Sequence, residues 1–120
     1  GGVMPGGAGY DTHFDGDADN SAQAGNVNPI RLYGLEVSNP NSADAYLQLF
    51  DLATGDVTVG TTTPKQSYLV PAGDGTLDGG IDMFFTDGMQ FEVALTYACT
   101  TTATGNTDPT TGLVLNFWFL

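Results

Sequence analysis

Basic residues are scarce in this chain of 120 residues, which has only two cations, Arg31 and Lys65. They stand against 14 acidic side chains, so the formal net charge is −12. Binding to a phosphate backbone depends on lysine and arginine, so this composition excludes direct recognition of nucleic acid. The same shortage disfavours contact with an anionic membrane surface. No apolar run in the sequence approaches the ~20 residues of a membrane-spanning helix.

Cysteine and histidine each occur once, as Cys99 and His13. A single cysteine cannot form an internal disulfide, and these ligands are too few for a zinc centre. A serine hydrolase needs an imidazole beside its nucleophile, and the serines here lie in polar turns or at strand starts. Cys99 lies in an apolar and threonine-rich run, so we expect a small buried side chain. These shortages predict a protein that is not an enzyme.

Turn residues and short alternating runs dominate most of the sequence. Only Glu36 and Glu92 among the acids are glutamate, and aspartate favours turns where glutamate favours helices. From residue 28 onward, alternating runs are separated by turn signals such as Thr86-Asp87-Gly88. Residues 30–37 alternate only if the frame slips at Gly34, and glycine inside a strand marks a β-bulge. The pattern predicts an all-β domain over residues 28–120, an antiparallel β-sandwich or a jelly-roll-like fold.

Residues 1–27 differ from the rest because glycine and aspartate dominate and large apolar residues are few. Such a segment buries too little surface to offset the entropy lost on ordering. We therefore expect a flexible N-terminal arm that becomes ordered against a neighbouring subunit. Its natural anchors are Met4, Tyr10 and Phe14, the larger apolar side chains of the segment.

Asp15, Asp17 and Asp19 alternate along this segment, as carboxylates do at the start of a calcium-binding loop. Asn20 stands where that loop has glycine, and Asn26 where it has a bidentate glutamate. Two interpretations remain open. The segment is either a solvated acidic arm or a weak calcium site formed by Asp15, Asp17 and Asp19. No other cofactor is expected.

The apolar segment 112–120 has two hydrophobic faces. Phe117 and Phe119 share one face with the preceding leucines, whereas Trp118 and Leu120 occupy the other. A single sandwich covers only one face of a strand, so we expect Trp118 and Leu120 at a subunit interface.

Three tyrosines have two possible interpretations, as a platform for sugar rings or as ordinary packing residues. They are Tyr33, Tyr46 and Tyr68.

Several strand and turn phrases resemble a family of small virion structural proteins encoded by tailed bacteriophages and prophages. The clearest phrase is Val59-Gly60-Thr61-Thr62-Thr63-Pro64. The others follow in order over residues 30–120, and they are Ile30-Arg31-Leu32-Tyr33-Gly34, Asn39-Pro40-Asn41, Tyr46-Leu47-Gln48-Leu49-Phe50-Asp51, Leu69-Val70-Pro71-Ala72-Gly73, Ala98-Cys99-Thr100-Thr101-Thr102-Ala103-Thr104-Gly105 and Thr111-Gly112-Leu113-Val114-Leu115-Asn116. The aspartate-rich segment 11–20 has no counterpart in that pattern. The segment at residues 74–80 is longer than the corresponding segment of the pattern.

The resemblance implies a compact β domain attached to a phage capsid or tail. We expect a capsid decoration (cement) protein on the outer surface of the head, where it stabilises the shell through subunit contacts. Its partners are then the major capsid protein or other virion subunits, and such proteins commonly sit as dimers or trimers. The alternative is a tail, baseplate or fibre module that binds host surface glycans.

Overall fold

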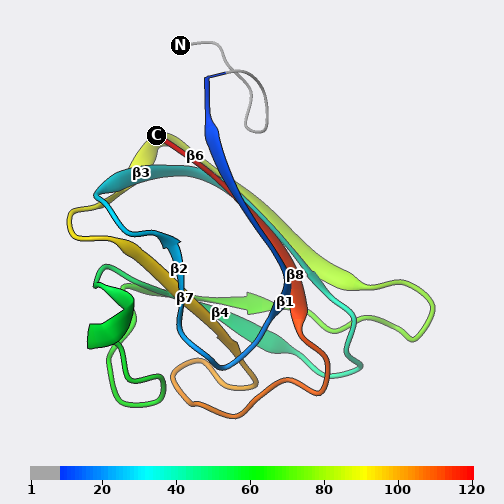
Figure 1. The fold of residues 1–120 in the computed structure, drawn as a ribbon. Coiled ribbons are helices and arrows are strands. Elements are labelled where there is room, and N and C mark those ends of the chain that lie inside the picture. The colour runs from blue at the N-terminus through cyan, green and yellow to red at the C-terminus, as the bar shows by residue number, and fades with distance from the viewer. Residues whose placement is uncertain (1–8) are drawn as a thin grey trace.

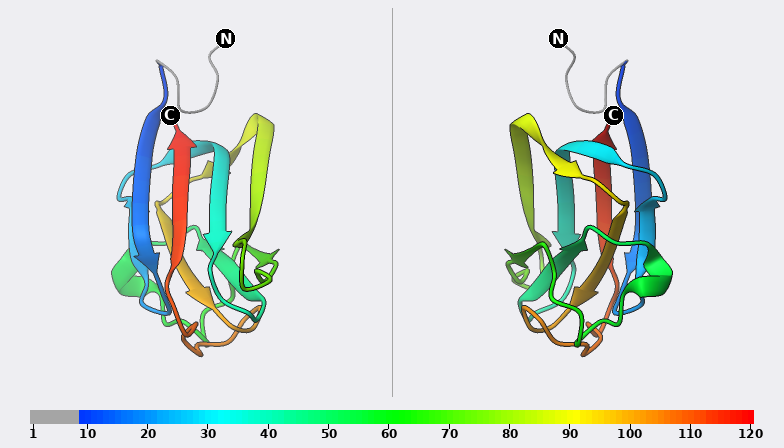
Figure 2. Two further views of the ribbon diagram at one scale, coloured as in Figure 1. Left: turned by 90° about the vertical axis from the view of Figure 1, so that its right-hand side faces the viewer. Right: turned by 90° about the vertical axis from the view of Figure 1, so that its left-hand side faces the viewer.

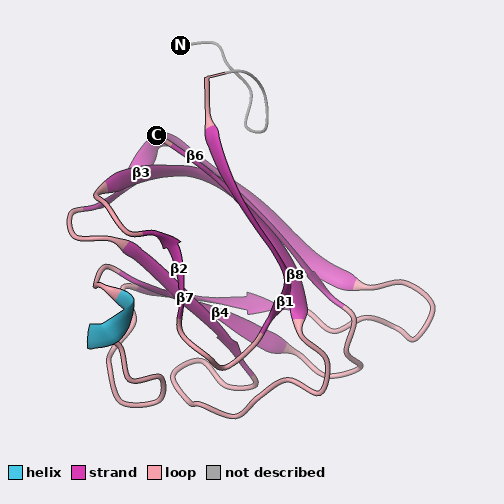
Figure 3. Ribbon diagram, in the orientation of Figure 1, coloured by secondary structure: helices cyan, strands magenta, loops and turns pink. Residues whose placement is uncertain are grey.

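The computed structural model describes residues 9–120, and this part of the chain is almost entirely strand and loop (Figure 3). It contains eight strands and one short 3-10 helix, η1. Their bounds are β1 (Asp11–Ala18), β2 (Gln23–Asn26), β3 (Ile30–Asn39), β4 (Ala45–Phe50), η1 (Thr54–Asp56), β5 (Gln66–Val70), β6 (Gly79–Phe91), β7 (Leu95–Thr100) and β8 (Leu113–Phe119). The predicted all-β fold is confirmed. No helix in this part of the chain is long and apolar enough to cross a membrane.

The strands form two antiparallel sheets of four strands that pack as a sandwich (Figure 1). The first sheet has the order β1-β8-β3-β6, seen face-on in the left view of Figure 2, and the second has the order β2-β7-β4-β5. Strand β1 pairs with β8, β2 with β7, β3 with β6 and β4 with β5. The chain is therefore a long antiparallel ribbon rolled into two layers, which is the strand order of a jelly roll.

The core lies between the sheets and follows the alternation of the sequence. In β8, Leu113, Leu115, Phe117 and Phe119 are buried, whereas the residues between them are half-buried on the outer face. Cys99 of β7 is buried in the same core, as expected. Burial raises the pKa of its thiol, and the nearby carboxylates of Asp15 and Asp19 raise it further, so it remains a protonated packing group.

The frame slip predicted at Gly34 is confirmed. The register of β3 shifts between Leu32 and Gly34 against both β6 and β8. Gly34 lies under two rings, since a Cβ placed there would come within 3.3 Å of Trp118 and 3.5 Å of Phe84. The bulge keeps the apolar residues on both sides of it turned toward the core.

The expected arm at residues 1–27 needs correction over its described part. Residues 11–18 form β1, which pairs with β8 at the edge of the first sheet, and residues 23–26 form β2, which pairs with β7. The low content of apolar residues suggested an arm because β1 fully buries only Ala18. The strand is held instead by backbone pairing to β8, far along the chain. Residues 1–8, with the proposed anchor Met4, lie outside the described residues.

The outer face of the second sheet is closed by two loops of the chain itself. Gln48 and Thr100 point away from the core yet are fully buried. The Gln48 side-chain amide donates to the Thr100 hydroxyl at 2.7 Å and to the Gly105 carbonyl of the β7–β8 loop at 3.0 Å. On the β4–β5 side, the Thr96 hydroxyl donates to the Leu52 carbonyl at 2.7 Å. Among residues 9–120, the outer face of the first sheet is therefore the sheet surface that no loop closes.

Candidate interaction surface

Exposed aromatic side chains gather on the outer face of the first sheet. Strand register places Thr12, Trp118, Gly34 and Phe84 in one row across the four strands of that sheet. The next row contains Phe14, Asn116, Glu36 and Asp82. Phe14 is 65% exposed and Phe84 is 61% exposed, which is high for phenylalanine. We call this surface the aromatic face, and its rings are Tyr10, Phe14, Tyr33, Phe84 and Trp118.

Trp118 occupies the middle of the aromatic face. Its strand, β8, lies between β1 and β3, and its row partner on β3 is Gly34. Because Gly34 has no side chain, the indole of Trp118 and the ring of Phe84 both approach the space above it. Trp118 is thus half-buried against the sheet rather than sealed in the core, while its neighbour Phe117 is fully buried.

Two tyrosines form the end of the aromatic face that lies near Leu120. The rings of Tyr10 and Tyr33 lie 5.4 Å apart between centroids and are tilted by 58°. Tyr33 also lies against Gly88, whose φ of +76° is in the left-handed region, and a Cβ there would come within 3.0 Å of the tyrosine ring. Leu120 is 56% exposed, and its backbone exchanges two hydrogen bonds with Arg31.

Two carboxylates lie opposite each other in the row beside Trp118. Glu36 of β3 faces Asp82 of β6 across the ladder, and both side chains are exposed. Like charges in directly opposed positions destabilise a sheet. Of the two cations of the chain, Arg31 lies on the outer side of β3 near Tyr33 and donates to the Asp87 carbonyl at 3.1 Å, and Lys65 lies 5.8 Å from the Phe91 ring centroid. The aromatic face therefore combines rings with concentrated negative charge.

The aspartates predicted to bind calcium do not converge on a common point. One oxygen of Asp15 accepts from the Tyr97 hydroxyl at 2.6 Å, and the other accepts from the Asp17 backbone N–H at 2.9 Å. Asp19 accepts from the Ser21 backbone N–H at 2.9 Å. No group of three metal-ligating side chains is found in residues 9–120. This geometry favours the interpretation without calcium, because Asp15 and Asp17 lie in an extended strand, whereas a calcium loop must curl around its ion.

A small, partly buried network fixes β1 to the core, and its members are His13, Asp15 and Tyr97. Nε2 of His13 lies 2.9 Å from the Tyr97 hydroxyl, and the ring of Tyr97 meets the Phe117 ring edge-on at 5.2 Å. Burial raises the pKa of Tyr97 far above its ordinary value, and the Asp15 carboxylate that accepts its hydrogen bond raises it further. The phenol therefore stays protonated, and its hydrogen bonds link β7 of the second sheet to β1 of the first.

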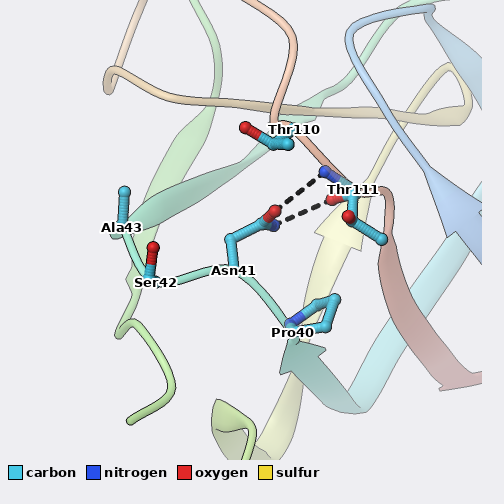
Figure 4. Close-up of a pocket in the computed structure, with 6 residues that line it drawn as sticks. All are labelled: Pro40, Asn41, Ser42, Ala43, Thr110 and Thr111. Atoms are coloured by element: carbon cyan, nitrogen blue, oxygen red, sulfur yellow. Dashed lines mark hydrogen bonds between the residues drawn. The ribbon is translucent and has the colours of Figure 1, made fainter. Parts of the chain in front are cut away.

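A polar hollow of about 310 Å³ lies at the opposite end of the sandwich from Leu120, between the β3–β4 and β7–β8 loops. It is lined by Pro40, Asn41, Ser42, Ala43, Thr110 and Thr111 (Figure 4). The Asn41 side chain exchanges two hydrogen bonds of 2.8 Å with the backbone of Thr111. Its amide thus joins the two loops, and the lining offers neither a charge nor an aromatic ring.

The three tyrosines considered for a sugar platform do not share a face. Tyr33 lies on the aromatic face, Tyr46 alternates to the outer side of the second sheet, and Tyr68 packs against the core. Burial raises the pKa of Tyr68. Phe84 was not predicted as a surface residue, although its neighbours pack on the core and leave it on the outer side, and these neighbours are Ile81, Met83 and Phe85. Of the predicted interface residues, the aromatic face unites Tyr10, Phe14 and Trp118.

Fold and surface together define the class of protein, a jelly-roll domain with one sheet closed by its own loops and the other open through an aromatic, acidic face. Comparisons with models of protein families, with curated proteins and with solved structures found no match. Because a fold of this kind hosts many functions, the open face is the feature from which function has to be inferred.

Proposed function

We propose that this protein is a structural component of the virion of a tailed phage, a decoration protein that binds the outside of the head. The observation that carries the proposal is the aromatic face, where Phe14 and Phe84 are more than half exposed while the second sheet is covered. Exposed apolar patches of this kind mark surfaces that bind other proteins. The resemblance of residues 30–120 to phage virion proteins supports the same function.

The proposed mechanism is burial of the aromatic face against assembled capsid subunits. A standard interface buries about 1,600 Å², and Trp and Tyr residues near its centre supply much of the binding energy. Copies arranged as dimers or trimers on a lattice add avidity. A protein that binds only the assembled shell stabilises the shell by mass action. None of these steps requires catalysis, so we propose a non-enzymatic role.

Co-sedimentation with expanded empty heads from the phage that encodes the chain tests the proposal. We expect the wild type to sediment with the heads and Phe14→Ser/Phe84→Ser to bind at least about tenfold more weakly, because two apolar anchors are lost. The matched control is Leu69→Ser/Leu77→Ser, which removes leucines that are 45% and 71% exposed outside the aromatic face. We expect the control to bind within about twofold of wild type. Heads that leave the wild type in the supernatant would refute decoration.

A second candidate function is a tail, baseplate or fibre module that binds host glycans. It is favoured by the pairing of rings with polar groups, since Trp118 and Phe84 lie one row from Asn116, Glu36 and Asp82. Sugar rings stack on aromatic faces while their hydroxyls bond to such polar groups. A glycan array would favour this function if it gave clear signals that Trp118→Ala abolished. Hydrolysis of capsular polysaccharide by the purified protein would contradict both candidates.

A further inference from the structure

We propose that the aromatic face binds an arginine-bearing apolar segment of a partner protein rather than a second copy of this chain. The inference rests on the proposed function and names the chemistry of its partner. Three features of the described residues carry it: the rings above Gly34, the carboxylate pair beside them, and the charge of the whole chain.

The rings beside Gly34 offer aromatic surface on which a guanidinium can stack. Trp118 and Phe84 both approach Gly34, and the glycine lets the indole lie close to the sheet. A cation within about 6 Å of an aromatic centroid is attracted to the ring face, most strongly for tryptophan. Arginine suits such a site better than lysine, because its guanidinium is planar and weakly hydrated.

The carboxylate pair lies within reach of a side chain stacked on those rings. Glu36 and Asp82 are two residues along β3 and β6 from Gly34 and Phe84, which corresponds to about 7 Å along a strand. The guanidinium of an arginine donates hydrogen bonds to carboxylates from its edge while its plane rests on a ring. A cation placed here also relieves the repulsion between the opposed acids.

A second copy of the chain is a poor occupant of the same surface. Each copy has a net charge of −12, and a symmetric pair would bring the Glu36 and Asp82 rows of both copies close together. Only two cations stand against them: Lys65 lies over Phe91, and Arg31, beside Tyr33 at one end of this face, donates to the Asp87 carbonyl. Charge complementarity therefore selects a basic partner. Contacts between copies on the shell then use other surfaces.

Fluorescence of Trp118, the single tryptophan of the chain, tests the inference directly. The probes are short peptides in which valine alternates with arginine, with lysine or with glutamate, and cellohexaose serves as a glycan probe. We expect a saturable change with the arginine peptide, binding about threefold weaker with lysine, and no change with the glutamate peptide or the sugar. A saturable response to the glutamate peptide or to cellohexaose, or none to the arginine peptide, would overturn the inference.

A pair of charge variants separates the local site from general attraction. Glu36→Gln/Asp82→Asn should weaken arginine-peptide binding about fivefold, which corresponds to two exposed ion pairs. The control Asp56→Asn/Asp78→Asn removes the same charge from exposed positions in η1 and the β5–β6 loop, and it should change binding by less than about twofold. Equal losses in the two variants would show that net charge, rather than this face, attracts the peptide.

Binding to heads distinguishes failure of the inference from failure of the proposed function. If heads bind the wild type and Glu36→Gln/Asp82→Asn equally well, decoration stands and the basic partner is wrong. If the arginine peptide binds but heads do not, the face keeps its preference and decoration is wrong. Analytical ultracentrifugation that reveals a dimer disrupted by Trp118→Ala would overturn the choice of partner in favour of a second copy.

Discussion

Replacing Asp51 with alanine should destabilise the protein by removing the hydrogen bonds that hold the turn between β6 and β7, which joins the two sheets. The Asp51 carboxylate follows β4 and accepts backbone N–H groups of this turn, from Glu92 at 2.9 Å, Val93 at 2.8 Å and Ala94 at 3.3 Å. Desolvation of the carboxyl raises its pKa, but these hydrogen bonds and the charge of Lys65 outweigh that effect and hold the pKa of Asp51 below its ordinary value.

The expected loss of stability follows from the number and setting of these bonds. Hydrogen bonds to a charged acceptor contribute about 1.5–3 kcal/mol each when buried. The site is partly exposed, so solvent screening reduces each to roughly 1 kcal/mol. The Ala94 bond is long, which leaves about 2–3 kcal/mol for Asp51→Ala. Asp51→Asn keeps one acceptor oxygen and should lose about 1 kcal/mol.

The effect should depend on pH in a defined direction. Because the folded-state pKa is lowered, the contribution of Asp51 is fully present above the unfolded-state value of about 3.9 and is lost as pH falls through the folded-state value. The stabilities of wild type and Asp51→Asn should therefore converge in acid, since a protonated carboxyl resembles an amide.

Urea unfolding monitored by Trp118 fluorescence at neutral and acid pH measures both effects. The control is Asp56→Asn, an exposed acid of η1, which should change the free energy of unfolding by less than about 0.5 kcal/mol at either pH. A loss below about 0.5 kcal/mol for Asp51→Ala at neutral pH would refute the reasoning. So would a difference in unfolding free energy between wild type and Asp51→Asn that stays constant as the pH falls.

Three further substitutions test other parts of the fold. Tyr97→Phe removes the hydroxyl of the partly buried network and should cost about 1–3 kcal/mol in urea unfolding, and a smaller change would make that network dispensable. Gly79→Ala places a Cβ in overlap with a backbone carbonyl oxygen and should cost at least about 3 kcal/mol, whereas Gly55→Ala, with open space around it, should leave the melting temperature nearly unchanged. Asp82→Asn relieves the repulsion from Glu36 and should raise stability by about 0.5 kcal/mol at low salt, a gain that high salt should remove.

The sequence predicted those features that depend on local period. The alternation in residues 112–120 indicated which side chains of β8 enter the core, and the broken alternation at Gly34 located the bulge. Both succeed because side chains in a strand alternate between two faces, whatever lies across the ladder.

Features that depend on distant partners were not predictable. Residues 11–18 carry polar side chains on the inward face, and His13 and Asp15 find their partner in Tyr97, more than 80 residues away. The spacing of Asp15 and Asp17 is the same in an extended strand and in an ion-binding loop, so it could not separate the two. Nothing local indicated that loops would close the second sheet and leave Phe84 exposed on the first.

The position of β8 between β1 and β3 has a consequence for how the chain reaches its native state. A ribosome releases β1 before β8, so the middle of the first sheet stays vacant until β8 has also emerged. Closure then requires contacts between β1 and β8, which are far apart in the sequence, a feature of slow, cooperative folding. Until that moment the nascent protein exposes apolar strands of the kind that aggregate or recruit chaperones. Loss of β8 would therefore abolish the whole layer rather than shorten one edge of it.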